Sequence, residues 1–242
     1  MEADPYAESG EYLDLLSQGA WQALRVPIGK ALRHVVPAAG PIVDVGAGSG
    51  LGVVVAAEAV ADADIVAVEP SPVLRAVLLA RVAGAEDLRR RVTVQAADVA
   101  SMRLPAGVGG VMAINMIGHL PPTRRAAFFA DVRKRLAPGA PLIVNLQPPA
   151  EVTTVPQSEF VSVVVGDRSY TGSGAARPAG EDSVTWTMTY RVLTGQGAVE
   201  REVVVNYPWY VLSRQRLLDE LAGAGFTTSV GEMDVVTAIS PG

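Results

Sequence analysis

The chain has 242 residues, of which 49% are hydrophobic, and it carries a formal net charge of -5. This length and apolar content can bury the core of one α/β domain, which we favour over two domains. The acidic balance argues against a nucleic-acid partner, which would need clustered lysine and arginine. With no cysteine and only two distant histidines, the chain has no disulfide, and we expect no metal site.

The first residues of the chain are acidic and polar, which argues against a secretory signal. No apolar run approaches the ~20 residues that span a bilayer, so we expect a soluble, cytoplasmic protein with no membrane partner. Abundant alanine, valine, glycine and arginine favour a bacterial source. The densest basic group, Arg89 to Arg91, is short, and we interpret it as the solvated end of a helix.

Residues 1–36 precede the first expected strand and are predicted to form a helical lid. Between Tyr12 and Val36, apolar side chains recur near helical spacing. Gly19 and Pro27 interrupt this run, which therefore predicts two short helices rather than one.

The segment from Pro41 to Gly52 predicts a strand, a glycine loop and a helix in succession. Residues 42–45 have the character of a buried strand, and the apolar run at 51–60 is expected to be helical. Glycine at alternate positions permits positive φ angles and lets a ligand lie against the main chain. An adenosine-bearing cofactor is the usual occupant of such a loop. The glycines are Gly46, Gly48 and Gly50.

An acid follows the second expected strand, residues 64–68, at Glu69. It lies 19 positions after Gly50, the distance at which a doubly wound α/β sheet places a carboxylate for the two ribose hydroxyls. A nicotinamide dinucleotide site is the rival, but it takes its third glycine three positions after its second. Asp44, just before the loop, would repel a pyrophosphate and suits a cationic sulfonium.

Together these residues resemble the class I S-adenosylmethionine-dependent methyltransferases, whose first strand leads through an acid into alternating glycines. Asp44 to Gly50 fits that pattern, Glu69 matches the ribose acid, and Asp98 matches the adenine acid. The turn at residues 136–139 also matches, so the resemblance covers roughly residues 40–147. It implies S-adenosylmethionine as cofactor, S-adenosylhomocysteine as product, and a doubly wound, Rossmann-like seven-stranded sheet. The cofactor-binding residues so implied are Asp44, Gly46, Ala47, Gly48, Gly50, Glu69, Pro70, Asp98, Val99 and Asn115.

The third expected strand, residues 92–96, delivers Asp98 to the carboxyl edge of the sheet. There its carboxylate can accept a hydrogen bond from the adenine amine, while the backbone N–H of the neighbouring Val99 can donate one. Alternatively, Asp98 caps the turn that follows it. Between the second and third strands we expect a helix at residues 70–83, capped by Ser71.

A fourth strand is expected at residues 110–116, followed by a helix at 123–136 and a fifth strand at 141–146. Parallel sheets bind ligands at the carboxyl ends of their strands, so Asn115 to His119 lie where the methyl group should be presented. His119 is the candidate general base for methyl transfer. The alternative is that it only shapes the strand-to-helix loop.

The C-terminal half is rich in short β runs, which predict an antiparallel addition at residues 151–210 that covers the substrate. The resemblance here is to bacterial small-molecule N-methyltransferases. A closing helix and strands are expected at residues 211–242. The β runs lie at 160–165, 183–192 and 199–207, and the first two are joined by a glycine-rich loop at 171–180.

Aromatic side chains are concentrated in the lid and after residue 185. They can form a flat apolar pocket for an aromatic acceptor, although some can equally be core beneath the added sheet. The predicted substrate-binding residues are Tyr12, Trp21, His119, Trp186 and Trp209, and Tyr6 is a further candidate cleft residue in the lid.

The sequence therefore predicts an enzyme that methylates an N, C or O atom of a small, aromatic or amine-bearing metabolite by in-line displacement. Specialised natural-product biosynthesis is the expected setting, and the protein is expected to be a monomer or homodimer. The alternatives are a non-catalytic S-adenosylmethionine-binding module and, less favoured, a nicotinamide-dependent oxidoreductase. The signature of base amino methylation does not follow the fourth strand, which argues against nucleic-acid substrates.

Overall fold

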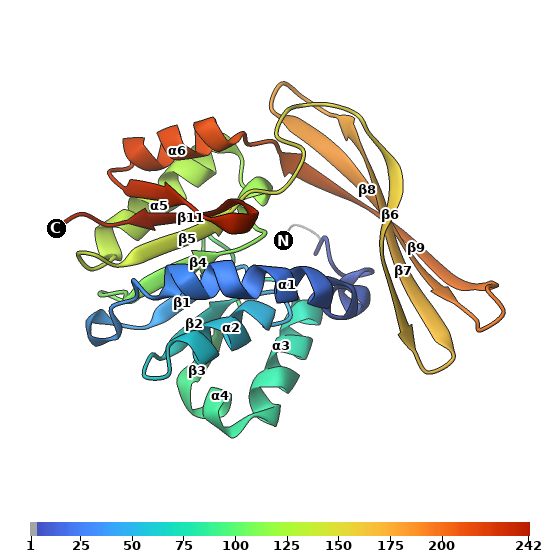
Figure 1. Ribbon diagram of the computed structural model, residues 1–242, viewed down its shortest axis with the longest axis horizontal. Coiled ribbons are helices and arrows are strands. Elements are labelled where there is room, and N and C mark those ends of the chain that lie inside the picture. The colour runs from blue at the N-terminus through green and yellow to red at the C-terminus, as the bar shows by residue number, and fades with distance from the viewer. Residues whose placement is uncertain (1–3) are drawn as a thin grey trace.

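The body of the protein is built on a seven-stranded sheet with the strand order β10-β11-β5-β4-β1-β2-β3 (Figure 1). The structure, a computed structural model, describes residues 4–242, so the first three residues of the predicted lid lie outside it. Strands β1 to β5 are mutually parallel, whereas β11 runs antiparallel to both β5 and β10. The strands are β1 (Ile42–Val45), β2 (Ile65–Val68), β3 (Val92–Gln95), β4 (Gly110–Ala113), β5 (Pro141–Asn145), β10 (Thr227–Val230) and β11 (Val235–Ile239).

Helices cover both faces of this sheet, which confirms the predicted doubly wound α/β architecture. The side chains along each strand contribute alternately to two cores, because successive side chains point to opposite faces of the sheet. Val43 packs with the helices of one face and Ile42 with those of the other. One face carries α5 (Pro122–Arg135) and α6 (Arg214–Gly223); the other carries α1 (Gly10–Leu32), α2 (Leu51–Ala59), α3 (Pro72–Gly84) and α4 (Glu86–Arg91).

The prediction of two short lid helices is wrong, because α1 is one continuous helix with Gly19 and Pro27 inside it. Proline removes one intrahelical hydrogen bond, which disfavours a helix interior. Here Pro27 is itself buried, between the buried side chains of Leu24 and Ile28 that pack on the core. Burial of this face offsets the lost bond, so tertiary packing outweighs local propensity. Among the described residues, no helix has the length and apolar character to cross a bilayer.

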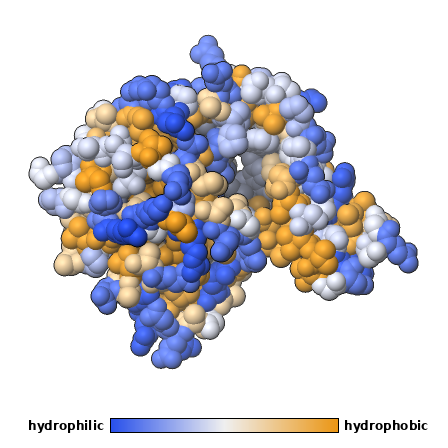
Figure 2. Space-filling view, in the orientation of Figure 1, coloured by the Kyte–Doolittle hydropathy of each residue, from blue (hydrophilic) through white to orange (hydrophobic). Residues whose placement is uncertain are grey.

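A second sheet projects from the body, with the strand order β6-β7-β8-β9 and antiparallel pairing throughout (Figure 1). This confirms the antiparallel addition expected in the C-terminal half. Apolar surface gathers on it, and Phe160, Val164 and Val204 are exposed there (Figure 2). The strands are β6 (Val155–Val165), β7 (Arg168–Pro178), β8 (Ser183–Leu193) and β9 (Val199–Tyr210).

The glycine-rich loop predicted at residues 171–180 is wrong, since most of this segment belongs to strand β7. Its glycines leave room for bulky side chains of the neighbouring strands. A β-carbon on Gly172 would lie 2.9 Å from the ring of Phe160, and one on Gly174 would lie 2.9 Å from the sulfur of Met188. Glycine therefore serves close packing within a strand here, rather than a turn.

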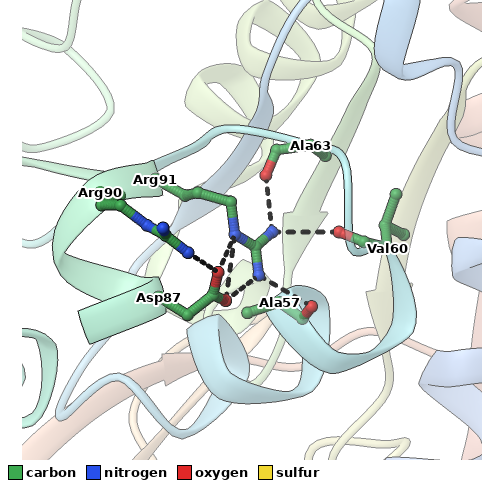
Figure 3. Close-up of polar contacts among 6 residues, drawn as sticks. All are labelled: Ala57, Val60, Ala63, Asp87, Arg90 and Arg91. Carbon is green, nitrogen blue, oxygen red and sulfur yellow. Dashed lines mark hydrogen bonds and ion pairs between the residues drawn. The ribbon is translucent and has the colours of Figure 1, made fainter. Parts of the chain in front are cut away.

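The interpretation of the basic group at residues 89–91 as a solvated helix end is wrong for Arg91. Its side chain is only 13% exposed and pairs with Asp87, one turn earlier in α4 (Figure 3). The guanidinium also donates to three backbone carbonyls, at 2.8–3.1 Å, in the end of α2 and the loop that leads to β2. These carbonyls belong to Ala57, Val60 and Ala63.

Substitution of Arg91 by methionine should lower the free energy of unfolding by about 2–4 kcal/mol, because partly buried carbonyls lose a charged donor. Urea denaturation followed by circular dichroism measures this. Arg89→Met is the matched control: Arg89 is exposed, and its replacement should change the value by less than about 0.5 kcal/mol. Equal effects of the two substitutions would contradict the assigned role of Arg91.

Candidate cofactor and methyl-transfer site

The glycine loop, Gly46 to Gly50, connects β1 to α2 and is tied to the carboxyl end of β2. The backbone N–H groups of Gly46 and Ala47 both donate to the carbonyl of Val68, at 2.9 and 3.0 Å. The three glycines have φ angles of 73°, 56° and 88°, which side chains with a β-carbon rarely adopt. The loop can therefore take this shape only because glycine occupies alternate positions.

Two of these glycines lie against protein and one faces open space. A β-carbon on Gly50 would lie 2.6 Å from Leu78, and one on Gly46 would lie 3.0 Å from Met116. A β-carbon on Gly48 would meet no atom within 4 Å. The middle of the loop is thus the point at which a ligand can approach the main chain.

Glu69 follows β2, is 3% exposed and points toward the glycine loop. Its carboxylate accepts hydrogen bonds from the backbone N–H of Gly48 and of Ser71, each at 2.8 Å. Burial raises the pKa of this carboxyl, although the two N–H donors oppose the rise. The backbone carbonyl of Pro70, the residue between Glu69 and Ser71, accepts a hydrogen bond from Arg75. The loop that is predicted to hold the ribose is therefore preformed.

Asp44, in β1, is 2% exposed, and its Oδ2 has no hydrogen-bond partner among residues 4–242. Burial, with a smaller contribution from Glu69, raises the pKa of Asp44 to about 7. A β-carbon on Gly52 would lie 2.8 Å from this oxygen and 2.9 Å from the ring of Trp21. The carboxyl thus lies at the start of α2, close to the lid, and an orphaned buried oxygen of this kind suits a cationic ligand group.

Asp98 lies in the exposed turn after β3, and its Oδ1 accepts hydrogen bonds from Ala100 and Ser101. These bonds lower the pKa of the carboxyl, the hydroxyl of Ser101 contributing most. Asp98 therefore caps the turn in the way that the alternative interpretation expects. Among the described residues the bonds to its carboxylate all go to Oδ1, so Oδ2 stays free for an adenine amine. Val99, next to it, is partly buried.

Strand β4 ends at Ala113, three residues earlier than predicted, because Asn115 has a φ angle of 59° that breaks the strand. The N–H of Asn115 donates to Oδ1 of Asn145, at 2.7 Å, and Nδ2 of Asn145 donates back to Oδ1 of Asn115, at 2.6 Å. The pair joins the carboxyl ends of β4 and β5. Asn145 was missed in the sequence; its only signal was a polar residue at the end of an apolar strand.

His119 ends the short 3-10 helix η2 (Ile117–His119) that follows β4. Its Nε2 lies 2.8 Å from the hydroxyl of Tyr6, and its ring meets that of Trp209 edge-on, 4.9 Å between centroids. Burial lowers the pKa of His119 to about 4, so the imidazole is neutral at pH 7. Trp209 is seated directly on Gly118, where a β-carbon would lie 2.0 Å from the indole.

The structure brings only some of the predicted substrate-binding residues together. Trp209 contacts His119, and Trp186 packs beside the small core that contains Trp209. Tyr12 instead stacks on Tyr190 of β8, with a centroid distance of 5.4 Å. Trp21 lies apart from this cluster, beside Asp44.

Two further lid residues join the cluster: Tyr6, a candidate cleft residue from the sequence, and Ser9, which the predicted site omits. Tyr6 packs against Tyr207 of β9, with 5.3 Å between ring centroids, and the hydroxyl of Ser9 hydrogen-bonds that of Tyr207. Sequence reasoning could not find these contacts because they pair the first residues of the chain with its last long strand. Among residues 4–242, no group of three histidine, aspartate or glutamate side chains is arranged to hold a metal ion.

A cavity of about 500 Å³ opens at the same edge of the sheet, beyond the carboxyl end of β5. Its walls are mainly apolar, and Arg214 pairs with Asp234 within them. It is lined by Leu146, Gln147, Pro148, Ala150, Leu212, Arg214 and Asp234.

Asp44→Asn tests the orphaned carboxyl. Because its folded-state pKa is raised from 3.8 to about 7, the folded protein keeps a proton that the unfolded chain releases between those values. The stability of the wild type relative to Asp44→Asn should therefore fall by roughly 2–4 kcal/mol as the pH rises through that window. Urea denaturation across this range measures the difference, with exposed Asp62→Asn as control. A pH-independent difference would contradict it.

Comparison with known proteins agrees with this geometry. Residues 42–139, from β1 to the turn before β5, match the family described as a methyltransferase domain. No curated protein sequence matches the chain significantly.

Several solved structures share the fold over almost the whole chain. DesVI from Streptomyces venezuelae has a TM-score of 0.77 at 17% identity, with both chains covered completely. CalS10 from Micromonospora echinaspora is an amino pentose methyltransferase solved with S-adenosylmethionine bound. Its TM-score is 0.75 at 18% identity, and the match covers 99% of this chain and 100% of the CalS10 chain. The sugar N-methyltransferase KedS8 from a Streptoalloteichus species has a TM-score of 0.76 at 17% identity, and the match covers 100% of this chain and 96% of the KedS8 chain. Residues 42–139 thus match a methyltransferase domain, and the chain as a whole shares its fold with solved methyltransferases, one of which holds S-adenosylmethionine.

Proposed function

We propose that the protein transfers the methyl group of S-adenosylmethionine to the amino group of a small, sugar-like metabolite in natural-product biosynthesis. The observation that carries this proposal is the meeting of two sets of side chains at one edge of the sheet. Buried acids and an open glycine loop lie at the ends of β1 and β2, and an aromatic cluster with His119 follows β4. The names of KedS8 and CalS10 support an amine on a sugar as the acceptor.

The residues present fit the cofactor. Glu69, held by Gly48 and Ser71, has a carboxylate placed to accept ribose hydroxyls. Nothing lies within 4 Å of a β-carbon built on Gly48, so a ligand can approach the main chain there, and the unpartnered oxygen of Asp44 favours a nearby positive charge. S-adenosylmethionine, when bound, supplies an electrophilic methyl carbon on its sulfonium. The role of the chain is then to hold an acceptor nitrogen in line with that carbon, at roughly 3 Å.

The aromatic cluster suits the acceptor side of this reaction. The largely buried rings of Trp209 and Tyr207 hold His119 and the lid residue Tyr6 in place, and an aromatic setting of this kind is typical of small-molecule sites. A neutral amine can attack directly and lose its proton afterwards, so methyl transfer to nitrogen does not require a strong base. Because His119 is neutral at pH 7, it does not repel a sulfonium. The cavity beyond β5 lies at the same edge of the sheet and has the size of a small-molecule site.

Calorimetry with S-adenosylmethionine, S-adenosylhomocysteine and NAD tests the cofactor. Both sulfur ligands should bind saturably and NAD should not. Glu69→Gln should weaken S-adenosylhomocysteine binding by at least about tenfold, because a hydrogen bond to a charged group contributes about 1.5–3 kcal/mol. The exposed Glu86→Gln variant is the control. Binding of NAD without either sulfur ligand would contradict the proposal.

Mass spectrometry of reactions with a panel of amino sugars and their hydroxyl analogues tests the acceptor. We expect a mass gain of one methyl group on amines and none on the analogues. Cofactor binding with no methylated amine across the panel, or methylation of the hydroxyl analogues alone, would contradict amine methylation.

His119→Ala tests the predicted catalytic residue. Turnover should fall about 100-fold, the loss that a misplacement of the acceptor by about 1 Å can cause, whereas the affinity for S-adenosylhomocysteine should stay within about threefold. The exposed His34→Ala variant is the matched control. Unchanged turnover in His119→Ala would reject a catalytic role, and an equal loss in His34→Ala would show that the effect is not local.

A further inference from the structure

Residues 4–9 form a strap that is tied to three elements around the candidate site. At one end, the carboxylate of Asp4 accepts a hydrogen bond from Ser71, in the loop after β2, at 2.8 Å. In the middle, the hydroxyl of Tyr6 meets His119. At the other end, Ser9 hydrogen-bonds Tyr207 of β9. The strap thus connects the ribose loop, the end of β4 and the projecting sheet.

The hydrogen bond between Tyr6 and His119 has one direction that satisfies both groups. Burial raises the pKa of the Tyr6 hydroxyl, with Tyr207 and Glu69 adding to the rise, so tyrosine keeps its proton. The pKa of His119 is lowered to about 4, so the imidazole is neutral and carries one ring proton. Among residues 4–242, Nε2 of His119 is the one partner within hydrogen-bonding distance of the Tyr6 hydroxyl. Tyr6 therefore donates, and Nε2 accepts.

We propose that Tyr6 is a positioning residue for methyl transfer, because its hydroxyl fixes His119 as the tautomer that carries its proton on Nδ1. With Nε2 engaged by Tyr6, His119 presents Nδ1–H as a hydrogen-bond donor. Such a donor suits an oxygen of the acceptor, for example a hydroxyl next to the amine. The catalytic consequence rests on the function proposed above, whereas the tautomer does not.

The surroundings of the imidazole also restrict its rotation. Tyr6 meets the ring edge-on at 6.0 Å between centroids, and Trp209 meets it edge-on at 4.9 Å. Trp209 cannot shift toward the backbone because it already lies on Gly118. His119 is thus held by lid and sheet together, and the Tyr6 hydroxyl is the contact that selects which nitrogen bears the proton.

Nuclear magnetic resonance of ¹⁵N-histidine-labelled protein tests this directly. The chain has two histidines, so a His34→Gln background leaves the signals of His119 alone. At neutral pH we expect the Nδ1–H tautomer in the free protein and with S-adenosylhomocysteine. Tyr6→Phe keeps the ring and removes the donor, so the Nε2–H tautomer should appear.

Ser9→Ala is the matched control, because it removes another tie of the same strap without touching His119, and it should leave the tautomer unchanged. An Nε2–H tautomer in the parent protein would overturn the proposal. So would identical spectra of the parent and Tyr6→Phe, or an equal tautomer change in Ser9→Ala. These spectra are decisive even if S-adenosylhomocysteine does not bind, a result that would count against the proposed function alone.

Turnover gives a second measure, with the amino sugar that the panel shows to be methylated. Tyr6→Phe should lower kcat about tenfold, the worth of one hydrogen bond to a positioned group, with S-adenosylhomocysteine affinity within about threefold. Ser9→Ala should lower kcat less than Tyr6→Phe does. Full turnover in Tyr6→Phe would overturn the catalytic part of the proposal.

Discussion

The site depends on two carboxyl groups that the sheet buries at the ends of neighbouring strands. Asp44 and Glu69 are each at most 3% exposed, and burial raises the pKa of both carboxyl groups. The charge of Glu69 adds to the rise at Asp44. Glu69 is stabilised by the backbone of Gly48, which also fixes the shape of the glycine loop. Asp44 has no such partner in the described chain. Glu69 thus has hydrogen-bond partners within the protein, whereas the unpaired carboxyl oxygen of Asp44 suits a positively charged ligand.

The parts of the fold that were predicted correctly are those that local sequence determines. The glycine loop, Glu69 and the five parallel strands follow from spacing and from apolar runs, and the ends of β1 and β5 lie within one residue of expectation. The errors arise where distant packing decides the outcome. Pro27 stays helical because a buried face holds it, and Gly172 lies in a strand because Phe160 needs the space.

In the candidate site, too, the residues that local sequence determines were predicted, whereas the contacts that depend on distant packing were not. The residues expected to hold the cofactor lie near one another because they follow consecutive strands of one sheet. The proposed acceptor side combines the lid, η2 and β9, so its contacts join residues far apart in the chain; Tyr6 and His119 are 113 positions apart. Aromatic content alone placed Trp21 with Trp209, whereas the structure places Trp21 beside Asp44. Which aromatic side chains meet is a property of the tertiary fold, and composition does not contain it.

The contact between Trp209 and Gly118 has a consequence for how such enzymes diverge. The last strand of the projecting sheet places its indole on the main chain of η2, at a distance that only glycine permits. An exchange of acceptor preference by grafting another β-sheet would therefore fail unless residue 118 and its loop were transplanted with it. The projecting sheet and the η2 loop can therefore change only together, although β9 and η2 lie far apart in the chain.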